Sequence, residues 1–390
     1  MKIYVIFLYV VLILRANIAI AQLKTGAQST NEYLPLLKDK KVALVINQTS
    51  LIGKTPLADS LIKLKIKISK IFVPEHGLFG NVQAGGDVNN STYKKTGIPV
   101  VSIYGQKVKP TSDDLKGVEM LIFDIQDVGV RFYTYISTLT YIMEACAENN
   151  IPLIVLDRPN PNGFYIDGPL LEKEYASFVG LHPVPVVYGM TIGEYARMVN
   201  EEGWLKNSIK CNLLVIKLTN YNHDYRYILP VPPSPNLTTK ESIYLYPSLC
   251  FFEGTDVSVG RGTEHPFELV GKPGFKHGNI TFTPKSIPGV SDHPPYENIE
   301  CRGFNVSEFC EDYILLTKHI YLFWLKGFYD QSDHKDKFFN NFFDNLAGTN
   351  KLREQIIKGV PIADIQKSWE PDINKFKLVR KKYLLYPDFQ

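Results

Sequence analysis

The sequence lacks the motifs by which nucleotide, metal and serine-hydrolase sites are most often identified. It contains no G-x-G-x-x-G, no G-x-x-x-x-G-K-[ST], no H-E-x-x-H and no G-x-S-x-G. The eight histidines are scattered and show no metal-ligand spacing. These absences argue against a nucleotide cofactor, a zinc site and a serine esterase, and we expect the protein to need no cofactor and no metal.

An excess of charge of one sign is also missing, and cysteine is rare. The 43 basic and 40 acidic residues leave a net charge of +3, which gives no electrostatic case for a nucleic-acid partner. The five cysteines are irregularly spaced, so a disulfide framework is not expected in so long a chain. The 390 residues and their ordinary composition suit two globular domains of about 100–200 residues each.

The single long apolar run lies at the N-terminus and has the features of a secretory signal. Lys2 precedes the run Ile3–Leu14, and Ala19-Ile20-Ala21 fits a small-x-small cleavage site. Arg15 ends the run well short of the roughly 20 residues that span a bilayer. We therefore expect residues 1–21 to be a signal peptide. The mature protein would be exported, periplasmic or extracellular, without a stable membrane anchor after signal cleavage.

The first half of the mature chain repeats one pattern, in which a short β-branched run is followed by a loop and a helix-like stretch. The runs are Lys41–Ile46, Ile68–Val73, Met120–Phe123, Pro152–Leu156 and Leu213–Leu218, and helices are expected at Ser137–Asn149 and Thr191–Glu201. Strands that alternate with helices predict an α/β fold with a Rossmann-like parallel sheet, over residues 22–235.

The pattern of alternating strands and helices ends at the rigid segment 232–236 (Pro-Pro-Ser-Pro-Asn), which we interpret as a linker or a cleft wall. Proline-rich loops follow, and then helical patterns at Phe309–Leu325 and Asp336–Leu346. We expect residues 236–390 to form a smaller C-terminal α+β domain that caps the sheet, with an active-site cleft between the two domains.

Polar residues collect where the predicted strands end. Ligands of open parallel sheets bind beyond the carboxyl ends of the strands, so these side chains are candidates for the site. They are Asn47, Glu75, His76, Asp124, Asp127, Asp157, Arg158 and Asn160.

The segment Val73–Gly80 carries the best candidate for an acid. A glutamate that follows a proline and precedes a glycine can be held still against a ligand, so Glu75 is a candidate general acid. The alternative is a loop glutamate paired with an arginine. His76 is equally compatible with a structural and with a ligand-binding role.

Two further segments combine carboxylates with arginine. Residues 123–135 contain Asp124 and Asp127, and then Arg131, Tyr133 and Tyr135 in the loop that follows. This set suits an acidic sugar. The alternative is an ion pair between an aspartate and Arg131 that fixes the loop. In residues 156–163, we expect Asp157 to orient Arg158, whose planar guanidinium would bind a carboxylate through two hydrogen bonds. A turn that caps the next element is the alternative.

The long polar loop 252–268 supplies a second carboxylate, Glu253, and a second candidate anion clamp, Arg261, although structural roles are as compatible with the pattern. Glycoside hydrolysis commonly needs two carboxyl groups that face one bond. Glu75 is the expected acid, with Asp124, Asp127 or Glu253 as its partner.

At these residues the chain resembles the NamZ-type exo-β-N-acetylmuramidases. The matching blocks are PEHGLFG (74–80), AGG (84–86), SIYG (102–105), FDIQDVGVRFYTYISTL (123–139), LDRPNPNG (156–163), GMTIGE (189–194), PSPN (233–236), EGTDVSVGRGTEHPFE (253–268) and YLLYP (383–387). The resemblance extends in order across nearly the whole mature chain. Two positions depart from the residues expected in many members: Tyr188 stands where a histidine is expected, and Val259 where a polar or acidic residue is expected.

The resemblance implies release of terminal N-acetylmuramic acid from the non-reducing ends of peptidoglycan chains, with Glu75 as the best match to a catalytic residue. The lactyl group of that sugar would explain a carboxylate-binding arginine, and the PSPN block adds Asn236 to the expected binding residues. Peptidoglycan-derived saccharides are the expected partners. The alternative is a non-catalytic muropeptide-binding protein with the same cleft. An esterase or amidase is disfavoured because no nucleophile elbow is present.

Overall fold

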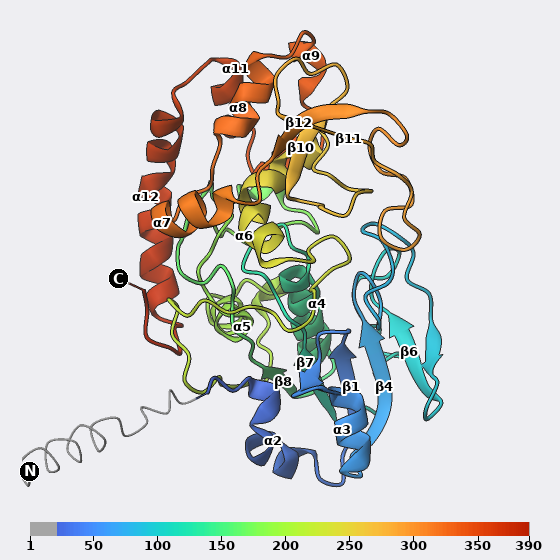
Figure 1. The fold of residues 1–390 in the computed structure, drawn as a ribbon. Helices are drawn as coiled ribbons and strands as arrows, with labels where there is room; N and C mark the ends of the chain where they lie inside the picture. The colour runs from blue at the N-terminus through green and yellow to red at the C-terminus, as the bar shows by residue number, and fades with distance from the viewer. Residues whose placement is uncertain (1–21, 390) are drawn as a thin grey trace, which may run out of the picture.

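A seven-stranded sheet forms the core of the N-terminal half of the computed structural model, which describes residues 22–389 (Figure 1). Its order is β5 (Ser91–Tyr93), β6 (Ile98–Ser102), β4 (Lys67–Val73), β1 (Lys41–Ile46), β7 (Met120–Asp124), β8 (Leu153–Leu156) and β9 (Leu213–Ile216). All neighbours pair in parallel except the edge strand β5. The predicted Rossmann-like parallel sheet is confirmed, and the predicted signal peptide lies outside the described residues.

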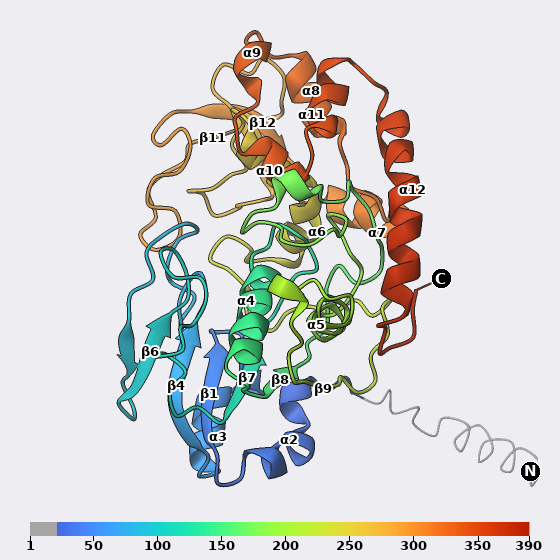
Figure 2. The same ribbon diagram turned by 180° about the vertical axis from the view of Figure 1, so that it is seen from behind.

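The two faces of the sheet are both covered, because side chains alternate along each buried strand. On β1, Val42, Leu44 and Ile46 face one core, which includes α2 (Thr30–Leu37) and α3 (Leu57–Lys63). Ala43 and Val45 face the other core, with α4 (Tyr135–Glu148) and α5 (Ile192–Glu201). Figures 1 and 2 show these helix pairs on opposite sides of the sheet. The continuous apolar runs in the sequence therefore reflect burial on both sides.

The C-terminal half is a smaller α+β domain above the sheet in Figure 1. Helix α6 (Lys240–Leu249) leads into a three-stranded antiparallel sheet, whose order is β10 (Leu269–Lys272), β12 (Cys301–Asn305) and β11 (Ile280–Phe282). The remaining helices are α7 (Leu315–Thr317), α8 (Phe323–Asp330), α9 (Lys335–Phe338), α10 (Phe343–Ala347), α11 (Lys351–Ile357) and α12 (Ile362–Lys381). This arrangement confirms the predicted fold class.

Two of the predicted C-terminal helices are broken. Phe309–Leu325 contains a π-helical turn (Cys310–Ile314) and α7, which ends at Lys318 with a left-handed φ of 58° before α8 begins. Asp336–Leu346 is divided into α9 and α10, and extended Phe339 ends the first of these. The apolar periodicity is present in both segments, but the backbone leaves the helical conformation at Lys318 and Phe339, so neither segment forms a single helix.

The end of the chain returns to the N-terminal half. Helix α12 runs down the side of the molecule (Figure 1), and Arg380 near its end donates to the Gly189 carbonyl at 2.9 Å. Beyond it, Leu385 N donates to Glu194 Oε1 and the Tyr386 hydroxyl donates to Asp157 Oδ2, at 2.7 and 2.5 Å. The C-terminal segment thus holds the two halves together. Between residues 22 and 389, no helix is long and apolar enough to cross a membrane.

Candidate active site

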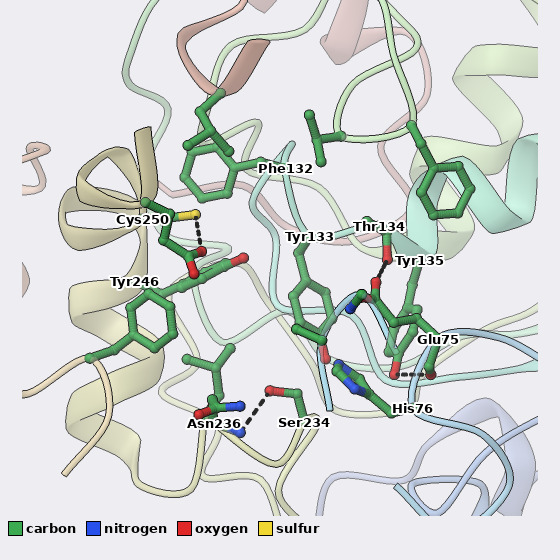
Figure 3. Close-up of a pocket in the computed structure, with 18 of the residues that line it drawn as sticks. Glu75, His76, Phe132, Tyr133, Thr134, Tyr135, Ser234, Asn236, Tyr246 and Cys250 are labelled. Atoms are coloured by element: carbon green, nitrogen blue, oxygen red, sulfur yellow. Dashed lines mark hydrogen bonds between the residues drawn. The ribbon is translucent and has the colours of Figure 1, made fainter. Parts of the chain in front are cut away.

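A cavity of about 500 Å³ is lined by residues of both halves of the chain (Figure 3). This volume lies within the range of about 300–1,000 Å³ that is typical of small-ligand sites. Seven of the predicted site residues line the cavity, namely Glu75, His76, Tyr133, Tyr135, Asn236, Glu253 and Arg261. The predicted position of the site in a cleft between the N- and C-terminal halves agrees with this arrangement.

Glu75 follows β4 and is held by three hydrogen-bond donors. Its Oε1 accepts from Gly85 N at 3.0 Å and from the Tyr104 hydroxyl at 2.8 Å, and its Oε2 accepts from Thr134 Oγ1 at 2.7 Å. Among residues 22–389 no arginine or lysine forms an ion pair with it, so the alternative of a loop glutamate paired with an arginine does not hold. Oε1 has two protein partners and Oε2 has one, so Oε2 is the oxygen better placed to carry a proton.

His76 lies in a tight turn in which Gly77 N donates to the Pro74 carbonyl. Its φ is 68°, a conformation that costs a non-glycine residue roughly 1 kcal/mol or more and is often found at functional sites. Nδ1 lies 2.7 Å from the Val82 carbonyl, and burial lowers the pKa of the imidazole although Glu75 opposes this. A carbonyl only accepts, so Nδ1 carries the proton and Nε2 is left as an acceptor.

Glu253 and Arg261 form the second charged group of the cavity. Arg261 Nε donates to Glu253 Oε1 at 2.6 Å, and Cys250 Sγ donates to Glu253 Oε2 at 3.5 Å. The guanidinium lies over the Phe267 ring, 5.0 Å from its centroid. No described side chain or carbonyl accepts from either Nη of Arg261, so two of its donor nitrogens remain for a ligand.

Aromatic rings form the wall between the two charged groups. Tyr133 lies edge-on to Tyr135 and to Tyr246, with ring centroids 4.8 and 6.0 Å apart, and Tyr246 lies edge-on to Phe267 at 5.0 Å. Figure 3 shows Tyr133 between Tyr246 on one side and Glu75 on the other. Such a wall offers apolar surface to a sugar ring between the two carboxylates.

The segment Pro232–Asn236 is a wall of the cavity, as one of its two predicted roles requires. The Tyr133 hydroxyl donates to the Pro233 carbonyl at 2.8 Å and holds this segment against the sheet domain. Asn236 Nδ2 donates to the Val290 carbonyl at 2.8 Å, and its Oδ1 is buried without a partner. A buried amide oxygen without a donor is costly, which makes Asn236 a candidate to accept from a ligand N–H or O–H.

The structure does not bring Asp124 and Arg158 into the cavity, which corrects the prediction that they contact the sugar. Arg158 Nε and Nη2 donate to Asp124 Oδ1 and Oδ2 at 2.6 and 2.9 Å, in a pair that is 4% and 0% exposed. The pair fills the point between β1 and β7 where the strand order reverses, the usual ligand crevice of this fold. The guanidinium is therefore committed to a protein carboxylate.

Replacing Arg158 by methionine is expected to lower the free energy of unfolding by about 3–5 kcal/mol, because it leaves the buried Asp124 carboxylate without a counterion. Urea denaturation at pH 7 measures the change. The double replacement Asp124→Leu/Arg158→Met is expected to lose less, since no buried charge remains. Neither residue lines the cavity, so folded Arg158→Met protein should keep its kcat; a fully stable variant with its kcat lost would contradict this assignment.

The other predicted carboxylates at the strand ends are also enclosed. Asp127 accepts from the Tyr188 hydroxyl and from Gly129 N, and burial raises its pKa to about 6. Asp157 caps α5, accepting from Thr191 Oγ1 and Gly193 N at 2.8 Å each, and burial raises its pKa to about 7. Asp157 thus has the capping role that was the alternative for its segment. Neither carboxylate lines the cavity.

Arg131 is fully buried rather than exposed to a ligand. Its Nη1 donates to the carbonyls of Pro169 and Val184, and its Nη2 to those of Leu346 and Ala347 at the end of α10. No carboxylate of residues 22–389 pairs with it, and burial lowers the pKa of the guanidinium to about 9. It joins the loop after β7 to the C-terminal domain, so its predicted contact with the sugar is corrected to a structural one.

Two of the asparagines predicted to bind the ligand, Asn47 and Asn160, do not line the cavity. Asn47 Nδ2 donates to the Tyr135 hydroxyl at 3.0 Å and so positions a cavity residue. Asn160 Nδ2 donates to the Met190 carbonyl at 2.8 Å, away from the cavity. Tyr188 and Val259, the two departures from the family pattern, are buried and do not line the cavity. Those departures therefore leave the composition of the cavity lining unchanged.

Sequence reasoning missed the groups that hold Glu75. Gly85, Tyr104 and Thr134 belong to the blocks AGG, SIYG and FDIQDVGVRFYTYISTL, respectively, but the sequence pattern assigned them no role. Their membership in these blocks is the signal that could have identified them as site residues. Among the described residues, no cluster of three histidine, cysteine or acidic side chains has the geometry of a metal site.

The fold and the cavity together define a two-domain α/β protein with the paired carboxylates of a glycoside hydrolase. The chain belongs to the exo-β-N-acetylmuramidase NamZ family. The family's N-terminal model matches residues 42–241 and its C-terminal model matches residues 244–386.

Similar proteins extend over most of this chain. It is 41% identical over 375 residues to the peptidoglycan β-N-acetylmuramidase NamZ of Bacillus subtilis (strain 168), covering 91% of this chain and 89% of that protein. Two DUF1343 family proteins of Bacteroides fragilis NCTC 9343 have similar crystal structures. One is 44% identical with a TM-score of 0.88, over 94% of this chain and 100% of that one. The other is 28% identical with a TM-score of 0.74, over 93% and 99%.

Proposed function

We propose that the protein is an exo-acting glycosidase that releases terminal N-acetylmuramic acid from the non-reducing ends of peptidoglycan fragments. The observation that supports this proposal most strongly is that Glu75 and Glu253, from the two halves of the chain, line the same cavity. Arg261 lies beside Glu253 and uses only Nε to bind it, so both Nη atoms can donate to a ligand. The similarity to a peptidoglycan β-N-acetylmuramidase along nearly the whole chain supports it.

Glu75 is the proposed general acid. Among residues 22–389 it has no arginine or lysine partner, and its Oε2 can hold the proton that the leaving oxygen needs. The Thr134 hydroxyl can donate to Oε2 whether Glu75 is ionised or protonated, because a protonated carboxyl oxygen keeps a lone pair. The hydrogen bond is therefore kept in both protonation states, and the proton on Oε2 is left free to face the leaving oxygen.

Glu253 is the proposed second carboxylate, in place of Asp124 and Asp127, which are enclosed. Of the three candidate partners, it is the one that shares the cavity with Glu75. Its Oε1 lies 2.6 Å from Arg261 Nε, so this carboxylate has a cationic partner beside it in the cavity. The two carboxyl groups thus differ in their charged partners, the condition under which one acts as acid and the other as carboxylate.

Arg261 is the proposed clamp for the lactyl carboxylate of N-acetylmuramic acid. The two free Nη atoms can donate to that carboxylate while Nε stays on Glu253. The aromatic wall of Tyr133, Tyr246 and Phe267 would take the apolar face of the sugar ring. Asn236 Oδ1, which lacks a donor, would accept from the N–H of the acetamido group.

Hydrolysis of a chromogenic N-acetyl-β-muramide beside the matching N-acetyl-β-glucosaminide tests the proposal. The two substrates differ only in the lactyl group. Selective cleavage of the muramide is the expected result, because the glucosaminide leaves the Arg261 donors unpaired. Equal cleavage of both would overturn the lactyl clamp, and cleavage of neither would overturn the proposed activity.

We also propose that the protein is exported with its signal removed after Ala21. The support is the sequence of the first 21 residues, with its basic start, apolar run and small residues at the cleavage point. Expression of the full chain in a bacterial host should give a protein outside the cytoplasm whose N-terminal residue is Gln22. Replacing Ala19 and Ala21 by arginine should block processing, and an unprocessed cytoplasmic protein from the unaltered sequence would contradict the proposal.

A further inference from the structure

A short turn beside the cavity presents an aromatic side chain that the chemistry above does not use. Ser177 and Gly180 exchange two backbone hydrogen bonds, each of 2.9 Å, so that Phe178 and Val179 form the tip of the turn. Both tip residues line the cavity. Gly180 anchors the turn: a Cβ there would lie 3.2 Å from Cδ of the buried Arg131.

The Phe178 ring is supported on two sides. It stacks on Tyr141 of α4, with ring planes 9° apart and centroids 6.3 Å apart. It also packs against Tyr104, with centroids 5.8 Å apart and planes inclined by 56°. Phe178 is nevertheless only half-buried. A half-exposed ring that is fixed by two others is a preorganised apolar surface at the edge of the cavity.

The position of Phe178 relative to Glu75 indicates which part of a substrate it would meet. Tyr104, which contacts Phe178, donates to Glu75 Oε1 at 2.8 Å. Glu253 and Arg261 lie with Cys250 and Tyr246, on the other side of Tyr133 from Glu75 (Figure 3). A sugar bound by Arg261 would thus reach Glu75 with its scissile bond, and the chain beyond that bond would lie on the Phe178 side.

We propose that Phe178, backed by Tyr141 and Tyr104, is the platform for the leaving-group sugar, and that it selects an uncharged N-acetylhexosamine there. This inference rests on the proposed function. No charged side chain is part of the platform, and the ring offers a flat apolar face of the size of a pyranose. Binding energy gained on the leaving sugar holds the glycosidic oxygen at Glu75, so it acts on the transition state as well as on the bound substrate.

The test compares two substrates that share the muramyl group. One is the β-1,4-linked disaccharide of N-acetylmuramic acid and N-acetylglucosamine, which has a leaving sugar. The other is methyl N-acetyl-β-muramide, whose leaving oxygen needs the same protonation by Glu75 but whose methyl group is too small to reach the platform. Phe178→Ala is expected to lower kcat/KM for the disaccharide by about 30-fold, the effect of removing one anchoring aromatic side chain. Its kcat/KM for the methyl glycoside should stay within about 2-fold of that of the unaltered protein.

Phe178→Tyr is the matched control, since it keeps the ring and should retain most of the disaccharide activity. An equal loss on both substrates would show that the turn only supports the fold or Glu75, and would overturn the platform. Unchanged activity of Phe178→Ala on the disaccharide would overturn it as well. If the unaltered protein hydrolysed neither substrate, the proposed function itself would fail, which is a result distinct from either of these.

Discussion

Replacing Glu75 by glutamine is expected to lower kcat on the β-1,4-linked disaccharide of N-acetylmuramic acid and N-acetylglucosamine by about 1,000-fold, while binding of the reaction product N-acetylmuramic acid changes little. Glutamine keeps an oxygen for Gly85 N and Tyr104, and its amide nitrogen can donate to Thr134 Oγ1, so the three contacts of the side chain survive. What is lost is the exchangeable proton of a general acid, which typically contributes about 10²–10⁴-fold. Steady-state kinetics and calorimetric titration of the product measure the two effects.

Glu268→Gln is the matched control. Glu268 is a buried glutamate that accepts from Thr239 Oγ1 at 2.6 Å and does not line the cavity, so its replacement should leave kcat unchanged. Hydrolysis that persists in Glu75→Gln would show that another group is the acid. Retained binding with no turnover in the variant, beside full turnover in the unaltered protein, separates an enzyme from a non-catalytic muropeptide-binding protein.

The sheet could be predicted well from the sequence because burial on both faces imposes long apolar runs. The prediction at Lys41–Ile46 coincides with β1, and Ile68–Val73 differs from β4 by one residue. The strands β5 and β6 were not predicted. They lie at the exposed edge of the sheet, where Pro99 interrupts the pattern and only part of each strand is buried. An apolar pattern reports burial, so it is weakest where a strand is half exposed.

The candidate site could be predicted only in part, because a sequence shows which residues are charged but not how they pair. Asp124 and Glu253 are both carboxylates near an arginine in the sequence pattern. In the fold, Arg158 donates through both Nε and Nη2 to Asp124, whereas Arg261 donates through Nε alone to Glu253. The difference depends on how deeply each pair is buried between packed elements, and that is a property of the tertiary structure.

The donors to Glu75 illustrate the same limit at longer range. Tyr104 and Thr134 lie 29 and 59 residues from Glu75 in the sequence. They reach it because Tyr104 follows the end of β6, the neighbour of β4, and Thr134 precedes the start of α4. The Phe178 turn depends on a buried arginine that binds four carbonyls from two parts of the chain. No local pattern encodes such a contact, so these residues could be identified only once the topology was known.

Replacing Arg261 by methionine is expected to lower the preference for the muramide over the matching glucosaminide by about 100-fold. Removing one partner of a desolvated, charge-assisted pair costs about 2–5 kcal/mol, and about 2.7 kcal/mol corresponds to a factor of 100. The loss applies only to the substrate that carries a lactyl carboxylate. The ratio of the two kcat/KM values is the measurement, because Arg261 also pairs with Glu253 and its removal slows both reactions.

Arg261→Lys separates the two roles of this side chain. A lysine keeps a positive charge near Glu253 but lacks the planar fork that binds a carboxylate with two parallel hydrogen bonds. It should therefore restore most of the glucosaminide activity lost in Arg261→Met, with a muramide preference still about 10-fold below that of the unaltered protein. A preference that survives in Arg261→Met would place the lactyl group away from the loop 252–268. No other guanidinium lines the described cavity, so neutral donors such as the hydroxyls of Ser234 and Tyr246 would then have to bind the carboxylate.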